Sequence, residues 1–325
     1  MRSLMRSSRH RVHFIINDHY IRFVESDKRH TFLSYRQKCL PAGVIEEGRI
    51  KDVEVFGMIL DEIVEEGKLK GSKITMCIPD PFMIVRKVSV PLEITEDELK
   101  GYLYMQLGET IHLPFDDPII EPVFLGGKGG LNEVLLIATK ESVIRDYTEI
   151  FEACSLKPVV ADLSILSLYR FYYHIGQANK KDHVLMVQLG MDTLQLSVFH
   201  DHYPSIVRHS KLSLTQEELE LKRGRSGQEF YIWNVEQSRL DGQARDINTE
   251  IERFMNFYRF NLTKGSHQIT KLILFGDHPY MDEYAGTISD SFELQVQTLI
   301  QPLFQIKKGI NIPPVFNDCI GLALK

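Results

Sequence analysis

Hydrophobic and polar residues alternate over most of the first forty residues, and the period then changes. A period of two predicts β-strands, whereas apolar residues spaced three and four apart predict an amphipathic helix. The polar run Asn17-Asp18-His19 interrupts the first alternation and predicts a tight turn between two strands. The predicted elements are a hairpin over 12–26, a third strand over 31–40, a helix over 53–66 and a buried strand over 73–79.

The first predicted helix places its apolar residues on one face, and Gly67 stands where a C-terminal cap belongs. The residues of that face are Val53, Phe56, Leu60 and Val64. A second helix begins after Thr95, which forms a capping box with Glu98. Its apolar residues are Leu99, Leu103, Leu107 and Ile111, each four from the next.

A strand over 81–91 precedes the second helix, and two strands near 119–125 and 132–138 follow it. The glycine run GGKGG joins those two strands. It lacks the Lys-Ser/Thr pair of a phosphate loop and no helix starts directly after it, which favours a flexible hairpin loop. With a helix over 140–153, the stretch 80–155 is predicted to be a small α+β module.

The second half repeats this order of elements without repeating the sequence, which indicates two related domains. After a helix over 162–175 and a polar linker at 179–182, three strands are predicted across 183–212. Charged residues 215–245 are predicted to be helix or loop. A helix over 246–260, a strand at 271–276, a strand within 291–300 and a short helix within 316–325 complete the chain.

Composition limits the classes of function. The 325 residues are 43% hydrophobic and 25% charged, with a net charge of -6, which indicates a soluble globular protein and argues against broad nucleic-acid binding. The four cysteines are far apart with no CxxC pair, which favours buried free thiols in a reducing compartment. No apolar run reaches the roughly 20 residues of a membrane span. The arginine-rich start lacks the apolar core of a secretory signal and indicates a solvated tail or a contact with an anionic membrane.

Taken together with its residues, this order of elements resembles the actin-like ATPase superfamily. Within it, the chain is similar to the PilM family of type IV pilus assembly proteins, which are relatives of the cell-division protein FtsA. The segments that carry the likeness are GVIEEGRIKD at 43–52, IPDPFMIVRKVSVP at 78–91, ITEDELKGYLYMQLGETIHLPFDD at 94–117, residues 133–170, VLMVQLGMDTLQLSVF at 184–199, KLILFGD at 271–277 and IGLALK at 320–325.

The resemblance implies an α/β fold: an actin-like (ribonuclease-H-like) two-domain fold with an FtsA-type, SHS2-like 1C insertion. Subdomain 1A would comprise 11–79 and 156–178, and subdomain 1C would comprise 80–155. The second domain would cover 179–325, with a 2B-like insertion at about 212–260.

The family's three nucleotide loops are degraded in this sequence. The positions that correspond to them are Asp18, Gln188, Gly190, Thr193 and Gly276. Bulky His19 and Tyr20 follow Asp18, Gln188 replaces an aspartate that would order Mg²⁺, and Asp277 brings a negative charge beside Gly276. The resemblance therefore implies an Mg-ATP site that is weak or lost, and a protein that is not a fast enzyme. An active actin-like ATPase, a small-molecule kinase or an FtsA-like filament protein are the alternatives.

Other chemistry-bearing residues have a plain structural explanation. Asp162 lies near the place where actin-like enzymes hold a residue that orients the attacking water, but the N-cap of a helix explains it equally well. His200-Asp201-His202 would make a weak metal site, and a hairpin turn is favoured. An ion pair accounts for Arg208. No metal site and no catalytic triad are predicted.

The resemblance also implies partners. PilM proteins clamp the cytoplasmic tail of PilN, an inner-membrane protein, between subdomains 1A and 1C. Candidate contact residues are Phe82, Ile84, Tyr102 and Tyr104, for each of which a place in the core is the alternative. The expected protein is a cytoplasmic adaptor on the inner face of the membrane, with indirect membrane contact and possible homo-oligomers. It would link a PilN-like tail to pilus motor and platform proteins.

Overall fold

The computed structural model describes residues 10–213, 218–224 and 229–325, and two mixed β-sheets form its centre. The first sheet has five strands in the order β10-β6-β1-β2-β3. It comprises β1 (His10–Ile16), β2 (Tyr20–Asp27), β3 (Phe32–Cys39), β6 (Lys73–Ile78) and β10 (Lys157–Leu163). The predicted hairpin and third strand are confirmed, with β1 and β2 antiparallel and β6 parallel to β1.

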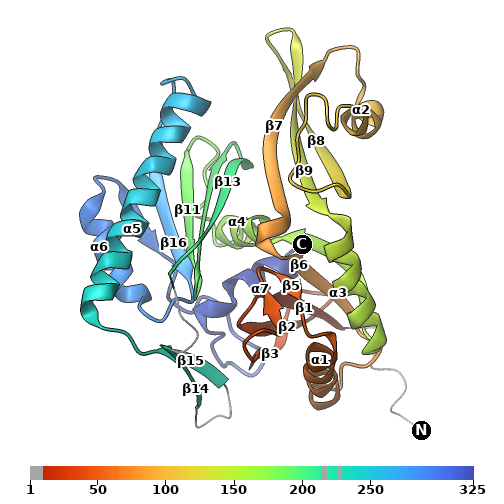
Figure 1. Ribbon diagram of the computed structural model, residues 1–325, viewed down its shortest axis with the longest axis vertical. Coiled ribbons are helices and arrows are strands. Elements are labelled where there is room, and N and C mark those ends of the chain that lie inside the picture. Colours follow the sequence, from red (N-terminus) through yellow and green to blue (C-terminus); the bar gives the residue numbers. More distant parts are fainter. Residues whose placement is uncertain (1–9, 214–217, 225–228) are drawn as a thin grey trace.

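The second sheet has eight strands in the order β17-β16-β11-β12-β13-β7-β9-β8. Its own strands are β11 (Val184–Leu189), β12 (Thr193–His200), β13 (Tyr203–Lys211), β16 (Lys271–Gly276) and β17 (Gln295–Thr298). The inserted module adds β7 (Met83–Pro91), β8 (Pro118–Lys128) and β9 (Leu131–Lys140). β13 pairs with β7 at Ile206 and Arg86, and Figure 1 shows β7, β8 and β9 extending beyond the other strands of the second sheet, at the top of the view.

Helices α4 (Ser164–His174) and α7 (Asn317–Ala323) lie between the two sheets and share one hydrophobic core with both of them (Figure 1). They pack so closely that a Cβ on Gly321 would lie 1.9 Å from the carbonyl oxygen of Ser167. α1 (Val53–Gly67) and α3 (Glu141–Ala153) cover the other face of the first sheet. Each half therefore buries its sheet between helices.

The remaining elements cover the outer surfaces. α5 (Gln237–Asn256), which continues as a π-helical turn (Phe257–Leu262), and α6 (Met281–Ser291) cover the outer face of the second sheet. α2 (Leu99–Met105) packs on the inserted strands. Two short hairpins are β4 (Ile45–Glu46) with β5 (Arg49–Ile50), and β14 (Leu219–Arg223) with β15 (Glu229–Trp233). Short 3-10 turns span Asp80–Phe82, Glu96–Glu98 and Pro314–Phe316. None of the helices in the described ranges is long and apolar enough to cross a membrane.

Several predictions about helix ends were wrong. The left-handed residue that ends α1 is Lys68, with φ of +55°, and Gly67 is the last helical residue, packed against Leu69. Val53 is 57% exposed because it begins the helix, outside the buried stripe. The Thr95–Glu98 capping box is confirmed, but the second helix ends at Met105.

Several elements were missed. The edge strand β10 was not predicted, because only its last two residues, Asp162 and Leu163, are buried and Pro158 interrupts its apolar pattern. α6 was not predicted either, although its buried side chains follow a helical spacing. Within 215–245, where helix or loop was expected, the structure has the hairpin β14–β15 and the start of α5. Residues 214–217 and 225–228 lie outside the described part of the chain, and so does the arginine-rich start at 1–9.

Candidate functional site

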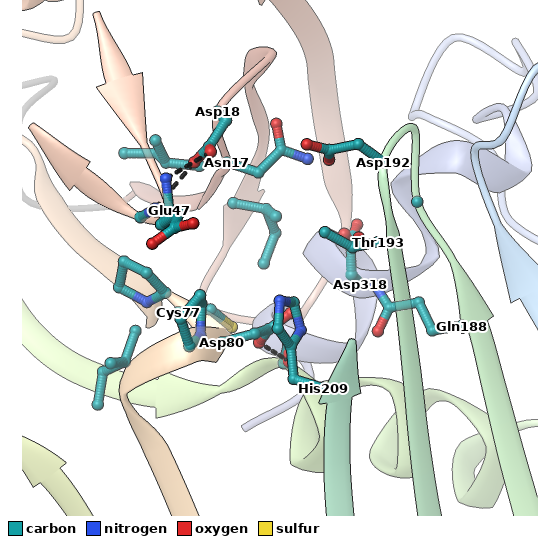
Figure 2. Close-up of a pocket in the computed structure, with 18 of the residues that line it drawn as sticks. Asn17, Asp18, Glu47, Cys77, Asp80, Gln188, Asp192, Thr193, His209 and Asp318 are labelled. Carbon is teal, nitrogen blue, oxygen red and sulfur yellow. Dashed lines mark hydrogen bonds between the residues drawn. The ribbon is translucent and has the colours of Figure 1, made fainter. Parts of the chain in front are cut away.

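A cavity of about 280 Å³ lies where the carboxyl ends of the central strands of both sheets meet (Figure 2). Open α/β sheets bind ligands at such strand ends. The first sheet contributes the β1–β2 turn with Asn17 and Asp18, and the second contributes the β11–β12 turn with Asp192 and Thr193. Asp80, which follows β6, and Ser164, which begins α4, also line the cavity. Of the five residues that the sequence predicted at this site, Asp18, Gln188, Gly190 and Thr193 line it, and Gly276 does not.

In the first turn, the side chains of Asn17 and Asp18 accept hydrogen bonds from nearby backbone N–H groups. Asn17 Oδ1 accepts hydrogen bonds from the backbone N–H groups of His19 at 2.9 Å and Tyr20 at 3.0 Å. Asp18 accepts from the N–H groups of Glu47 at 2.6 Å and Gly48 at 2.9 Å, which ties the turn to the β4–β5 hairpin. Burial raises the pKa of Asp18 in spite of these bonds. A phosphate loop works by offering free N–H groups to its ligand, and this turn has given them to side chains.

The second turn is closed in the same way. Gly190 donates its N–H to the carbonyl oxygen of Thr193 at 2.8 Å, and a Cβ on Gly190 would lie 2.4 Å from Thr193 Oγ1. Gln188 Oε1 is buried and has no hydrogen-bond partner among the described residues. His19 Nε2 lies 3.1 Å from the Asp192 carboxylate and so joins the first turn to the second. Burial lowers the pKa of His19, but the hydrogen bond and charge of Asp192 outweigh it and raise the pKa overall.

The third turn follows Gly276, which does not line this cavity; it lines a smaller neighbouring pocket together with Arg22 and Asp277. Gly276 has φ of +145°, and a Cβ there would lie 1.9 Å from the carbonyl oxygen of Leu189. That same oxygen accepts the N–H groups of Asp277 at 2.9 Å and His278 at 3.2 Å. Gly276 is therefore required for the close approach of β16 to β11, whatever the cavity binds.

The charge of the lining is mostly negative. Its carboxylates are Asp18, Glu47, Asp80, Asp192, Asp277 and Asp318, against Lys211 and His209. Lys211 Nζ lies 3.3 Å from a carboxylate oxygen of Glu47 and is thereby partly neutralised. Burial raises the pKa of Asp80, which hydrogen-bonds Ser164, and raises that of Asp318 to about 6.

These observations test the fit of Mg·ATP. Carboxylate and amide oxygens suit a hard divalent cation, but the polyphosphate would face six carboxylates, of which Asp192 is paired with His19, Asp277 with Arg22 and Glu47 with Lys211. In the turns, the N–H groups of His19, Tyr20 and Gly190 are already bonded. The residues present do not fit the phosphates of a nucleotide. Among the described residues, no group of three His, Cys, Asp or Glu side chains is placed to hold a metal ion.

Asp162 lies outside the cavity lining, at the end of β10. Its carboxylate is 4% exposed and contacts Arg170 at 3.0 Å and Lys325 at 3.3 Å. The N-cap prediction was wrong, because α4 begins at Ser164 and Leu163 is its N-cap. Ser164, which sequence reasoning missed, lines the cavity in its place; its position just after an apolar strand gave no chemical signal.

The four candidate partner residues do not form one surface. Phe82 is buried in the core of the first sheet beneath Arg49, whose guanidinium lies 4.7 Å from the ring centre. Ile84 and Tyr102 are partly buried in the core of the inserted module. Tyr104 is 39% exposed, and its hydroxyl bonds the backbone of β8 at Pro118 and Ile120.

The two remaining motifs are structural. Asp201 and His202 adopt positive φ values of +52° and +66° in the β12–β13 turn, as the turn interpretation requires. Arg208 lies 3.7 Å from Glu250 and over the ring of Phe254, which confirms the predicted ion pair.

Comparison with known proteins agrees with this architecture. One solved structure, described as the PilM-PilN type IV pilus biogenesis complex, matches with a TM-score of 0.73 and 16% identity, and the match covers 96% of this chain and 97% of that chain. The ethanolamine utilization protein EutJ from Carboxydothermus hydrogenoformans matches with a TM-score of 0.51 and 12% identity, over 97% of this chain and 89% of that one. The actin-like α/β fold expected from the sequence is thus confirmed.

A family model settles the classification. The model described as type IV pilus assembly protein PilM matches residues 16–311, which is most of the chain. With its three closed loops and its inserted module, this chain belongs to the PilM family of type IV pilus assembly proteins.

Proposed function

We propose that this protein is a cytoplasmic adaptor of a type IV pilus machine, or of a related competence or type II secretion machine. It binds the cytoplasmic tail of a PilN-like inner-membrane protein and thereby sits at the inner face of the membrane. The observation that carries the proposal is the likeness to a PilM-PilN complex over 96% of this chain. Pilus motor and platform proteins would be its further partners.

The central cavity acts as a scaffold in this proposal, with ATP binding weak or lost. Direct contacts across the cavity, His19 with Asp192 and Arg22 with Asp277, join the two halves where a nucleotide would otherwise bridge them. The turns that would bind phosphate bond to themselves instead. Because these contacts hold the two halves in one arrangement, the protein would present the same surface to its partners whether or not nucleotide is available.

The inserted module, which we take as a subdomain over 80–155, supplies the docking surface for the tail. Its exposed large apolar side chains include Tyr104 at 39%, Met105 at 70% and Phe124 at 37%. Strand addition along the start of β8 is blocked, because Tyr104 bonds the outward backbone groups of Pro118 and Ile120, and Pro122 has no N–H. The tail would therefore dock through side chains.

A labelled peptide of the partner's cytoplasmic tail tests the adaptor function by fluorescence anisotropy. We expect saturable binding that weakens at least about tenfold in Tyr104→Ala, because exposed aromatic residues dominate such contacts. Tyr173→Ala is the matched control, since Tyr173 is 57% exposed but lies on α4. If the peptide fails to bind, the adaptor proposal is wrong; equal losses in both variants would refute the docking surface alone.

The alternative is a working actin-like ATPase, and isothermal titration with Mg·ATP separates the two. We expect no binding heat at millimolar ATP and no nucleotide on the purified protein. Micromolar binding would instead show that the cavity opens to take nucleotide, and would favour a nucleotide-gated adaptor or an enzyme.

A further inference from the structure

A second cavity, of about 420 Å³, lies at the opposite end of the first sheet from the central cavity. It is formed by the start of β1, the end of β2 and the end of α7. The residues that line it are Arg11, His13, Ser26, Asp27, Lys28, His30, Ala323 and Lys325. Neither the nucleotide loops nor the proposed docking surface includes any of them.

The floor of this cavity is polar where the rest of the sheet is apolar. On the far face of β1, Val12, Phe14 and Ile16 are buried in the first hydrophobic core. On the face beneath α7, His13, Ser26 and Thr75 are only 3%, 2% and 2% exposed. Buried polar side chains cost free energy unless they are hydrogen-bonded, so their presence under a cavity calls for a reason.

These three side chains form one chain of hydrogen bonds. His13 Nδ1 lies 2.7 Å from Thr75 Oγ1, and His13 Nε2 lies 2.9 Å from Ser26 Oγ. If the Thr75 hydroxyl donates to Nδ1, then Nε2–H donates to Ser26 Oγ. The Ser26 hydroxyl, which faces the cavity, is then free to donate to a ligand.

The rim of the cavity is cationic. Arg11 and Lys28 are exposed, and neither forms an ion pair within the described residues, whereas Lys325 Nζ is held by Asp162 at 3.3 Å. The nearest carboxylate on the rim, Asp27, accepts the N–H groups of Arg29 at 2.8 Å and Thr31 at 3.0 Å. Burial is the main cause that lowers the pKa of His13, on the floor of the cavity, to about 3, and the charges of Arg11 and His30 lower it further.

The ring of His30 is held in a fixed orientation at the rim of the cavity. The residue lies in the left-handed region at φ of +57°, and its Nδ1 lies 2.7 Å from the carbonyl oxygen of Ala323. A carbonyl only accepts hydrogen bonds, so Nδ1 carries the proton.

We propose that this cavity binds the phosphate group of a phosphate-bearing ligand, either free phosphate or an anionic lipid headgroup. Arg11 and Lys28 supply the charge, Ser26 supplies a hydroxyl donor, and the neutral His13 fixes that hydroxyl from below. Charge-assisted hydrogen bonds to phosphate are the contacts that such a set of donors makes best.

Inorganic phosphate at constant ionic strength is the first probe, followed through the imidazole and backbone NMR signals of the full chain. We expect saturable shifts at His13 and His30, and binding at least about tenfold weaker in the double variant Arg11→Gln, Lys28→Gln. The double variant Arg259→Gln, Lys264→Gln is the charge-matched control, because it removes one exposed arginine and one exposed lysine from the second half. Ser26→Ala keeps every charge and should also weaken binding. Absence of shifts, or equal losses in the control, would overturn the proposal.

Vesicles distinguish the two sources of phosphate. Co-sedimentation with phosphatidylglycerol vesicles, but not with phosphatidylcholine vesicles, and its loss in the double variant would identify a lipid headgroup. Phosphate binding without vesicle binding would identify a soluble phosphate. The double variant should still bind the partner's tail peptide, so this test does not depend on the proposed adaptor function.

Discussion

The guanidinium of Arg22 lies 2.6 Å from the carboxylate of Asp277, and both side chains are less than a tenth exposed. Arg22 belongs to β2 of the first sheet, and Asp277 follows β16 of the second. The guanidinium also lies 3.6 Å from the ring centre of Tyr20 and donates to the carbonyl oxygen of Val315. This buried ion pair joins the two halves of the molecule beside the central cavity, which Asp277 also lines.

Breaking this pair from one side should be costly. Asp277→Ala leaves the Arg22 charge buried without its carboxylate, and we expect a loss of about 3 kcal/mol in the free energy of unfolding, measured by urea denaturation. The double variant Arg22→Met, Asp277→Leu should recover much of that loss, because it removes both charges. A loss below about 1 kcal/mol in the single variant, or purely additive losses, would contradict a coupled pair.

Gly276→Ala should destabilise the protein severely, because its Cβ would lie 1.9 Å from the carbonyl oxygen of Leu189 and φ is +145°. Gly286→Ala is the control: it lies within α6, and nothing stands within 4 Å of its added Cβ. That control should stabilise the protein by about 0.5–1 kcal/mol, as expected for glycine to alanine within a helix. Thermal denaturation measures the stability of both variants. Similar melting temperatures for Gly276→Ala and Gly286→Ala would show that position 276 does not require glycine.

Stability should fall as the pH drops below neutral. His13 has an ordinary pKa of 6.5 when unfolded and of about 3 in the folded protein, so the unfolded state binds more protons between these values. This residue alone should cost about 2 kcal/mol between pH 7 and pH 5. Denaturation in phosphate-free buffer should give a flatter pH profile for His13→Gln. His183 and His278, whose pKa values are lowered to about 4, titrate both in the unmodified protein and in His13→Gln. If the stability of these two proteins has the same pH dependence, the assignment to His13 is wrong.

Asp117 caps α3 from outside the helix. Its carboxylate accepts the N–H of Ser142 at 2.9 Å and pairs with Lys140 at 2.9 Å, while the N-cap residue Lys140 makes no side-chain cap of its own. Asp117→Ala should cost about 1 kcal/mol, and Asp117→Asn less, because the amide oxygen still accepts. The contacts with Lys140 and Ser142 lower the pKa of Asp117, so this stabilisation is present above pH 3.8 and is lost as the pH falls through the folded value. Chemical denaturation at pH 7 measures both variants, and equal losses would exclude the cap.

Local patterns predicted the elements that have a strong local signal. The β1–β2 hairpin followed from alternation around Asn17, and the capping box from the spacing of Thr95 and Glu98. The edge strand β10 has few buried neighbours, so its pattern was too weak to predict. The spacing of Met281, Tyr284, Ala285 and Ile288 carried a helical signal for α6 that was overlooked.

By itself, the sequence determined most of the order of elements, the positions of the three degraded loops and the likeness to the PilM family. These features depend on periodicity and on residue type at fixed spacing. The tertiary structure alone decided that Asn17 bonds the N–H groups of its own turn, that Arg22 reaches Asp277, and that Arg11 and Lys325 border one cavity. These arrangements bring together residues as far apart in the sequence as 11 and 325. No local pattern encodes them, because they arise only when two sheets and the helices between them pack together.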